Sequence, residues 1–144
     1  MKAEIKIDPD CITPHAVIYA ATIDEEVQRI LKIFTDEGGP LSATSDDRIY
    51  LVEPEDVLLL RVEGGKTQIV TKNRTLQSPR RLYELHDALG RDFVRISKSA
   101  VVNLNACESM EATWGGMMRL YLKNGESEYI SRHYLPAFKK RLGL

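Results

Sequence analysis

Two short segments of this sequence bring positively charged and hydroxyl side chains close together. The first is residues 93–103, where Arg95, Ser97, Lys98 and Ser99 stand among apolar residues that can pack. The second is residues 131–134, which are Ser131, Arg132, His133 and Tyr134. Guanidinium, ammonium and hydroxyl groups contact phosphate oxygens and guanine edges in DNA. Either segment alone also fits an ordinary solvated loop, and their joint occurrence favours an anionic ligand.

Three cations in these and a neighbouring segment are candidate ligand contacts. Arg132 offers a planar fork of donors that matches O6 and N7 of guanine in a bidentate contact. Ser131 can either cap the following helix or reach a phosphate through its hydroxyl. Lys98 adds an ammonium group, and Lys66 offers another on the glycine-rich stretch 63–66.

The net charge of −1 is distributed unevenly along the chain. Residues 1–56 hold thirteen acids and five bases, whereas residues 57–144 hold eight acids and fifteen bases. Such a split indicates an anionic partner for the C-terminal part, although two differently charged solvated faces would give the same count.

Motifs for catalysis and metal binding are not found. Gly65-Lys66-Thr67 resembles the end of a P-loop, but Leu60 stands where that motif needs a glycine. The histidines lie in separate segments without Cys or Glu at metal-ligand spacing, and they are His15, His86 and His133. We therefore expect no enzyme, no metal site and no cofactor.

The sequence also predicts a cytoplasmic location. No run approaches the roughly 18 apolar residues of a membrane span, and the N-terminus alternates charged and apolar residues, unlike a signal peptide. Cys11 and Cys107 lie far apart, which is typical of small buried thiols in a reducing compartment.

Residues 1–45 are expected to form a small acidic module of strands and one helix. Short strands are predicted at 4–7 and 16–20. Asp24 can cap the helix that follows, and Gly38-Gly39-Pro40 can end it before a polar linker over 41–47. The apolar face of this helix would consist of Ile23, Val27, Ile30, Leu31 and Phe34. The module suits dimerisation or docking of a partner.

Residues 46–144 predict a mainly β fold with a few short helices. Hairpin turns are expected at 63–66 and at 123–126, the latter because Asn-Gly accepts the positive φ angles of a type I′ turn. Ser78-Pro79 is expected to begin a helix that buries Leu82, Leu85 and Leu89 and ends at Gly90. A last helix would point Leu135, Phe138 and Leu142 inward. Strands are predicted at 48–52, 57–62, 68–71, 74–77, 93–96, 100–104, 117–122 and 127–131.

Residues from about 48 to 144 resemble the LytTR DNA-binding domain of bacterial transcription regulators. The run Arg-x-x-x-Ser-x-x-Val-Asn within 95–103, followed by Ser-Arg at 131–132, is the most specific part. The matching stretches are Arg48–Val52 with Asp56-Val57, Arg81–Leu85, Phe93–Asn103, Lys123–Glu126 and Tyr129–Tyr134.

The resemblance implies an elongated, mostly β fold that inserts loops, rather than a recognition helix, into successive major grooves. It also implies paired binding to repeated sites with bending of the DNA. By position in the family pattern, Lys98 and Arg132 are the expected base readers, with Lys66 as a third. Arg95, Ser97, Ser99, Ser131 and His133 are expected to contact phosphates or to orient the loops. Asn103 is expected to brace the turn after its strand.

Well-known members of this family carry a phospho-receiver domain ahead of the DNA-binding domain, and residues 1–45 are too short for that fold. The chain therefore resembles a stand-alone member. By the same resemblance we expect a homodimer formed through residues 1–45, or inhibition by a regulatory membrane-protein partner, without insertion of this chain into the membrane.

Two rival interpretations remain. One is a protein-interaction module whose acidic helix binds a partner and whose basic half is merely solvated. The other is a single-stranded nucleic-acid binder that stacks bases on Trp114, Tyr121 and Tyr129, which fit strand packing as readily. Comparing the affinity for promoter DNA with that for random duplex separates the regulator from the interaction module.

Overall fold

The computed structural model describes residues 2–35 and 40–144, without the side chains of residues 32–35. The contacts within the chain divide it into two compact units, residues 1–36 and residues 37–144. They differ in kind: the described residues of the first include one helix and no strand, while the second is built on β-sheet.

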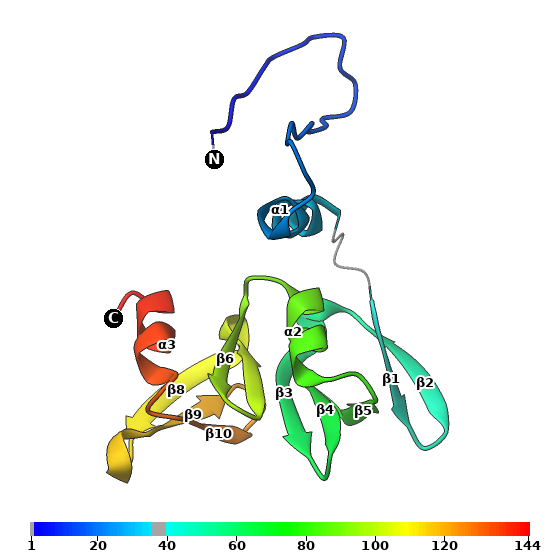
Figure 1. The fold of residues 1–144 in the computed structure, drawn as a ribbon. Helices are drawn as coiled ribbons and strands as arrows, with labels where there is room; N and C mark the ends of the chain where they lie inside the picture. Colours follow the sequence, from blue (N-terminus) through cyan, green and yellow to red (C-terminus); the bar gives the residue numbers. More distant parts are fainter. Residues whose placement is uncertain (1, 36–39) are drawn as a thin grey trace. The chain divides into compact units, whose positions relative to one another are not determined.

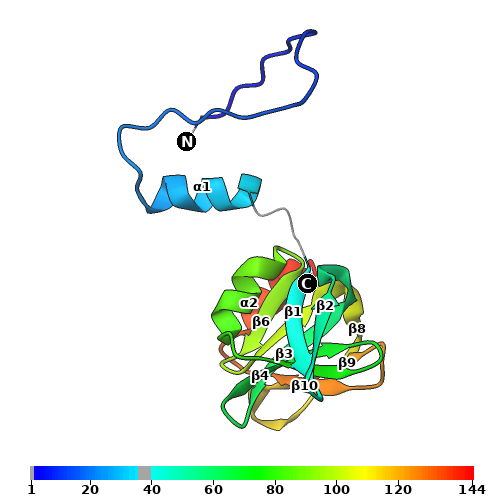
Figure 2. The ribbon, with the colours of Figure 1, turned by 90° about the vertical axis from the view of Figure 1, so that its right-hand side faces the viewer.

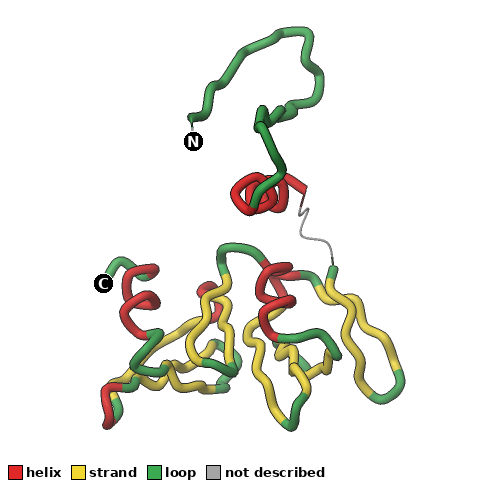
Figure 3. The backbone as a smooth tube through the Cα atoms, in the orientation of Figure 1, coloured by secondary structure: helices red, strands yellow, loops and turns green. Residues whose placement is uncertain are grey.

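The helix of the first unit is α1 (Glu25–Thr35), and Figure 3 shows loop along the chain before it. Asp24 caps this helix, because its Oδ1 accepts a hydrogen bond from the backbone N–H of Val27 at 2.9 Å. Acidic residues at 25 and 26 suit the positive end of the helix dipole. The predicted helix and its cap are confirmed. The side chain of Phe34 and the glycines at 38–39 lie outside the described part of the chain.

Residues 2–24 form neither helix nor strand, so the strands predicted at 4–7 and 16–20 are wrong. Ile5 and Ile7 are each 87% exposed. Alternation of apolar residues gives a strand one apolar face, but a strand also needs a neighbour for its backbone hydrogen bonds. The described residues of this unit supply no such neighbour.

The second unit contains a seven-stranded antiparallel sheet in the order β2-β1-β5-β4-β3-β7-β6 (Figure 1). Its strands are β1 (Leu41–Ser45), β2 (Arg48–Val52), β3 (Val57–Glu63), β4 (Lys66–Thr71), β5 (Thr75–Ser78), β6 (Phe93–Ser97) and β7 (Ala100–Asn103). A three-stranded antiparallel sheet, β10-β9-β8, is made of β8 (Cys107–Ala112), β9 (Met118–Leu122) and β10 (Ser127–Ile130).

The described residues of this unit also include two α-helices, α2 (Leu82–Leu89) and α3 (Leu135–Arg141). Short 3-10 turns lie at Pro54–Asp56, Leu104–Ala106 and Trp114–Gly116. The expected fold class, mainly β with a few short helices, is therefore confirmed.

Apolar side chains pack on both faces of the larger sheet. In β3, Leu60 belongs to a cluster with α2, whereas its neighbour Leu59 belongs to a cluster with α3 and the smaller sheet. Successive side chains of a strand point to opposite faces, so the larger sheet lies between these two layers. Figure 2 shows α2 against one side of the strands. Phe138 of α3 is fully buried on the other side.

The predicted buried faces of α2 and α3 are largely confirmed. Leu82, Leu85 and Leu89 of α2 are buried, and Gly90 ends this helix at a φ of 88°. In α3, Pro136 lies in the first turn, as expected. Leu135 packs against the core, but Leu142 is 40% exposed and does not point inward as predicted.

Two further sequence predictions of local structure are wrong. Ser78 does not begin α2; it is the last residue of β5, pairs with Thr67 and is 2% exposed. Its hydroxyl instead accepts a hydrogen bond from the N–H of Arg80 at 3.2 Å, a local turn of the kind that serine also favours. The polar linker expected over 41–47 is β1 and the turn that joins it to β2.

Candidate nucleic-acid interface

Three segments with candidate cations lie side by side at one end of the larger sheet. The N–H of Val62, near the end of β3, donates to the carbonyl of Ser99 at 2.8 Å. The N–H of Ser131, just after β10, donates to the carbonyl of Ile96 at 2.9 Å. The β3–β4 turn, the β6–β7 turn and the β10–α3 connection are therefore linked through backbone hydrogen bonds (Figure 1).

The β6–β7 turn presents Lys98 on a braced backbone. The Arg95 guanidinium donates to the carbonyl of Ser97 at 3.0 Å and to that of Lys98 at 2.5 Å. The hydroxyl of Ser97 accepts from the N–H of Ser99 at 3.2 Å, and a break in register lies between β6 and β7 here. Lys98 itself is exposed, with no ion pair among the described residues. Arg95 and Ser97 are expected either to contact phosphates or to orient the loop. The hydrogen bonds that they make within the turn suit the second role.

The β10–α3 connection presents Arg132 and His133, both of which are exposed. Ser131 does not cap α3 through its side chain; its carbonyl accepts from the N–H groups of Tyr134 and Leu135 at 3.1 and 3.0 Å. The Ser131 hydroxyl oxygen is buried and has no hydrogen-bond partner among the described residues. A contact of this hydroxyl with a phosphate would therefore require the connection to change its conformation.

Lys66 is the first residue of β4 and pairs in register with Glu63. The two residues of the turn between them, Gly64 and Gly65, have φ angles of 61° and 76°. Glycine adopts these angles without steric strain, which explains why the predicted hairpin forms. Lys66 is exposed, and β3 lies between its strand and β7 in the sheet.

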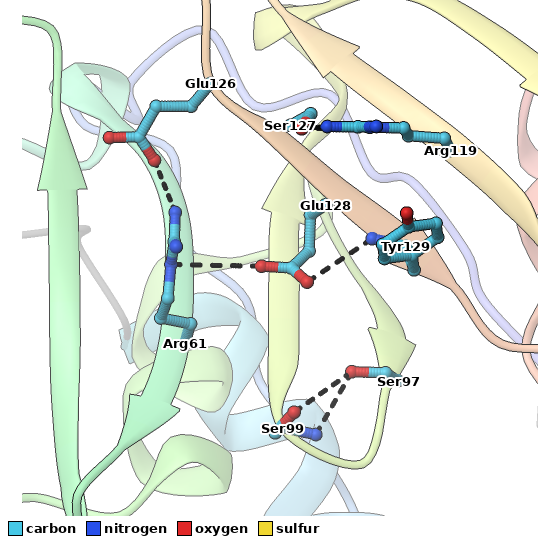
Figure 4. Close-up of polar contacts among 8 residues, drawn as sticks. All are labelled: Arg61, Ser97, Ser99, Arg119, Glu126, Ser127, Glu128 and Tyr129. Atoms are coloured by element: carbon cyan, nitrogen blue, oxygen red, sulfur yellow. Dashed lines mark hydrogen bonds and ion pairs between the residues drawn. The ribbon is translucent and has the colours of Figure 1, made fainter.

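An ion-pair cluster that the sequence did not reveal lies close to these segments (Figure 4). Arg61 of β3 is ion-paired with Glu126 and, at 3.9 Å, with Glu128 of β10. Their side chains are between 25% and 37% exposed, so the pairs are partly shielded from water. The cluster ties the larger sheet to the smaller one. It also engages one cation of the basic half in an internal contact.

A second polar cluster lies on the outer face of the smaller sheet. The Arg119 guanidinium donates to the Ser127 hydroxyl at 3.1 and 2.9 Å, and its centre lies 5.4 Å from the Tyr121 ring and 5.6 Å from the Tyr129 ring. The Tyr121 hydroxyl donates to Glu111 at 2.5 Å, and this bond raises the pKa of Tyr121. Tyr121 and Tyr129 thus pack as strand residues, whereas Trp114 lies outside the strands and is 93% exposed.

Asn103 braces the fold, as expected. Its amide group donates to the carbonyl of Val57 at 2.9 Å, and its side-chain oxygen accepts from the N–H of Asn105 at 2.9 Å. The residue is only 4% exposed, which keeps this side chain away from a ligand.

The described residues offer little for other chemistry. They contain no group of three or more His, Cys, Asp or Glu residues that could hold a metal ion. Burial raises the pKa of the Cys107 thiol to about 11, although nearby Lys123 acts the other way. Cys11 is exposed, so the expectation of a buried thiol is wrong for this residue. None of the helices in the described ranges has the length and apolarity that a membrane crossing requires.

Comparison with known proteins gives a consistent result. The sequence profile of the LytTr DNA-binding domain matches residues 47–143. Relatives described as uncharacterized HTH-type transcriptional regulators occur in Staphylococcus aureus. Those of strains bovine RF122 / ET3-1 and COL are each 31% identical over 146 residues, covering 100% of this chain and 99% of the relative.

A solved structure has the same fold. It is a LytTr DNA-binding domain from Bacillus cereus, which aligns with a TM-score of 0.70 at 25% identity over 74% of this chain and 98% of its own. Together with the profile match across the β-sheet unit, this similarity shows that the chain belongs to the LytTR family of DNA-binding domains.

Proposed function

We propose that this chain is a transcription regulator that reads repeated sites in double-stranded DNA, with Lys98 and Arg132 contacting base edges in the major groove. The observation that carries this proposal is the hydrogen bond from the Ser131 N–H to the Ile96 carbonyl. It holds the Arg132 connection against the strand that leads into the Lys98 turn. Two exposed cations from segments far apart in sequence are thereby available to one ligand.

Loops, rather than a recognition helix, make these contacts. A helix-turn-helix needs two helices joined by a short turn, and no two α-helices of the described residues are consecutive in this way. In α2, the apolar face is buried against the larger sheet. The relatives named as HTH-type regulators support a regulatory role, and in this chain that role falls to the turns.

The remaining candidate residues fall into two groups, those with exposed side chains and those hydrogen bonded within the β6–β7 turn. Ser99 and His133 are exposed and are assigned to phosphate contacts, and Lys66 to a third base contact. Arg95 and Ser97 are assigned to holding the β6–β7 turn, because both are hydrogen bonded within it.

The N-terminal unit is assigned to dimerisation, which repeated DNA sites would require. The unit exposes apolar side chains that a partner surface can cover, among them Ile5, Ile7 and Ile12. A cytoplasmic location, where the DNA lies, belongs to the same proposal. Inhibition by a membrane-protein partner remains an alternative use of this unit.

Binding to duplex DNA from the promoter of the chain's own operon tests the proposal. Affinity for that duplex should exceed affinity for random duplex by roughly 10³ or more. Arg132→Ala and Lys98→Ala should each weaken specific binding by about 1–3 kcal/mol.

The matched control is Lys72→Ala, an exposed lysine after β4, at the opposite end of that strand from Lys66. This variant should bind as the unaltered chain does. Intact specific binding in both the Arg132 and Lys98 variants would show that the base-reading assignment is wrong. Equal affinity for random and promoter duplex would favour the interaction-module interpretation.

A further inference from the structure

The turn between β8 and β9 has a defined shape and an unusually exposed tip. The N–H and the hydroxyl of Thr113 both donate to the carbonyl of Met117 at 3.0 Å, which closes the turn. Between them stand Trp114, Gly115 and Gly116, and the two glycines have φ angles of 75° and 74°. Trp114 is 93% exposed, more than any other large apolar side chain described in residues 41–144.

This turn directly contacts Arg132. A Cβ atom added to Gly116 would lie 2.8 Å from Cδ and 3.0 Å from Cγ of Arg132. The aliphatic part of the arginine therefore lies against the Gly116 backbone, in space that every other residue type would fill. A Cβ added to Gly115, which has nearly the same φ, would meet nothing within 4 Å. A side chain at position 116 would therefore displace the Arg132 side chain from its present place, whereas one at position 115 would not.

The chemistry of Trp114 suits the backbone of duplex DNA. An indole ring has one N–H donor and a flat apolar surface. The DNA backbone offers phosphate oxygens as acceptors and deoxyribose rings as apolar surface. At protein–protein interfaces, tryptophan and arginine are among the residue types that contribute most binding energy. Here the two stand on segments that touch each other through Gly116.

We propose that the β8–β9 turn is a further DNA-binding segment, in which Gly116 positions Arg132 and Trp114 packs against the sugar–phosphate backbone next to it. This inference rests on the proposed function. It adds an uncharged contact and a positioning residue to the cations of the loops.

The first test uses Trp114 itself, because the chain contains a single tryptophan. Fluorescence quenching by acrylamide is measured for the free protein and for the protein saturated with promoter duplex, while anisotropy of a labelled duplex reports binding independently. The accessibility of the tryptophan to acrylamide should fall several-fold in the complex. Saturated binding with unchanged quenching overturns this inference alone. Absence of saturable binding overturns the proposed function and the inference with it.

The second test distinguishes an uncharged contact of Trp114 with the DNA from an electrostatic effect. Trp114→Ala should weaken binding to the promoter duplex about tenfold and leave the salt dependence unchanged, since no cation is lost. Tyr83→Ala is the control, because Tyr83 is an exposed aromatic residue on α2. Equal affinities of the Trp114 variant and the unaltered chain would contradict the proposal.

The third test compares the two glycines. Gly116→Ala and Gly115→Ala impose similar backbone strain, but only the former displaces Arg132. Thermal melting by circular dichroism shows whether both variants fold equally well. Gly116→Ala should bind the promoter duplex about tenfold more weakly than Gly115→Ala, and this difference should vanish in an Arg132→Ala background. Equal binding by the two variants, or a difference that persists without Arg132, would overturn the positioning role of Gly116.

Discussion

The N-terminal unit and the β-sheet unit use similar sequence patterns with opposite results. Residues 4–7 alternate charged and apolar side chains, yet Ile5 and Ile7 remain exposed and form no strand. In β9, residues 119–122 also alternate, and there Leu120 and Leu122 are buried. Alternation therefore produces a strand only where neighbouring strands and a second layer are available. The β-sheet unit contains these within itself, whereas the N-terminal unit does not among its described residues.

The largest expected difference between the two units is in stability. Phe138→Ala removes a fully buried ring and should lower the free energy of unfolding by about 3–5 kcal/mol. Ile7→Ala truncates an exposed side chain and should change it by less than about 0.5 kcal/mol. Urea unfolding followed by circular dichroism measures both. A comparable loss in the Ile7 variant would show that the N-terminal unit has a packed core after all.

Truncation tests where the β-sheet unit begins. A chain that begins at Leu41 should keep its cooperative unfolding transition, because β1 is retained. A chain that begins at Asp46 lacks β1, with its buried residues Leu41 and Ala43, and should lose about 3 kcal/mol.

Light scattering on the chain that begins at Leu41 also tests the dimer. It should be monomeric if the N-terminal unit forms the dimer. A dimer of unchanged stability would remove that role from the N-terminal unit.

The two thiols should differ in reactivity. Cys11 is exposed, whereas burial raises the pKa of Cys107 to about 11, so that only about one in a thousand Cys107 side chains is a thiolate at pH 8. Ellman's reagent at pH 8 should therefore modify one thiol per folded chain rapidly, and Cys11→Ser should abolish this fast phase. Rapid modification of two thiols per folded chain would contradict the burial of Cys107 at the start of β8.

The smallest effect is expected for the helix cap. Asp24→Ala removes the acceptor for the Val27 N–H and should destabilise α1 by about 1 kcal/mol. Helical ellipticity should fall, while the unfolding midpoint of the β-sheet unit should stay the same. A shift of that midpoint would show that the two units unfold together.

Local chemistry made much of the fold predictable from the sequence. Gly64 and Gly65 stand where the β3–β4 turn needs positive φ angles, and leucines at helical spacing placed the buried face of α2. The hairpin at 123–126 also forms, but only Gly125 has a positive φ there, so the predicted type I′ turn, which needs one at Asn124 too, is wrong. β8 was not predicted, because the sequence Cys-Glu-Ser-Met-Glu-Ala lacks apolar alternation. Its position depends on pairing with β9, which only the folded chain supplies.

The candidate site was predicted in part for similar reasons. Lys98 and Arg132 are exposed, as the residue types suggested. The contacts that hold them depend on distant partners: Ile96 bonds to Ser131, and Gly116 lies against Arg132. The ion pair of Arg61 with Glu126 joins residues 65 positions apart, which no local pattern reveals.

The most direct test asks whether Arg132 recognises one particular base pair of the promoter site. Each G·C pair of the promoter site is replaced in turn, and affinities of the unaltered chain and of Arg132→Ala are measured at one salt concentration. In the unaltered chain, replacing one particular G·C pair in each repeat should weaken binding by about 1–3 kcal/mol. The same replacement should not change the affinity of Arg132→Ala. If Arg132→Ala keeps the same preference at every G·C pair, Arg132 does not read the DNA.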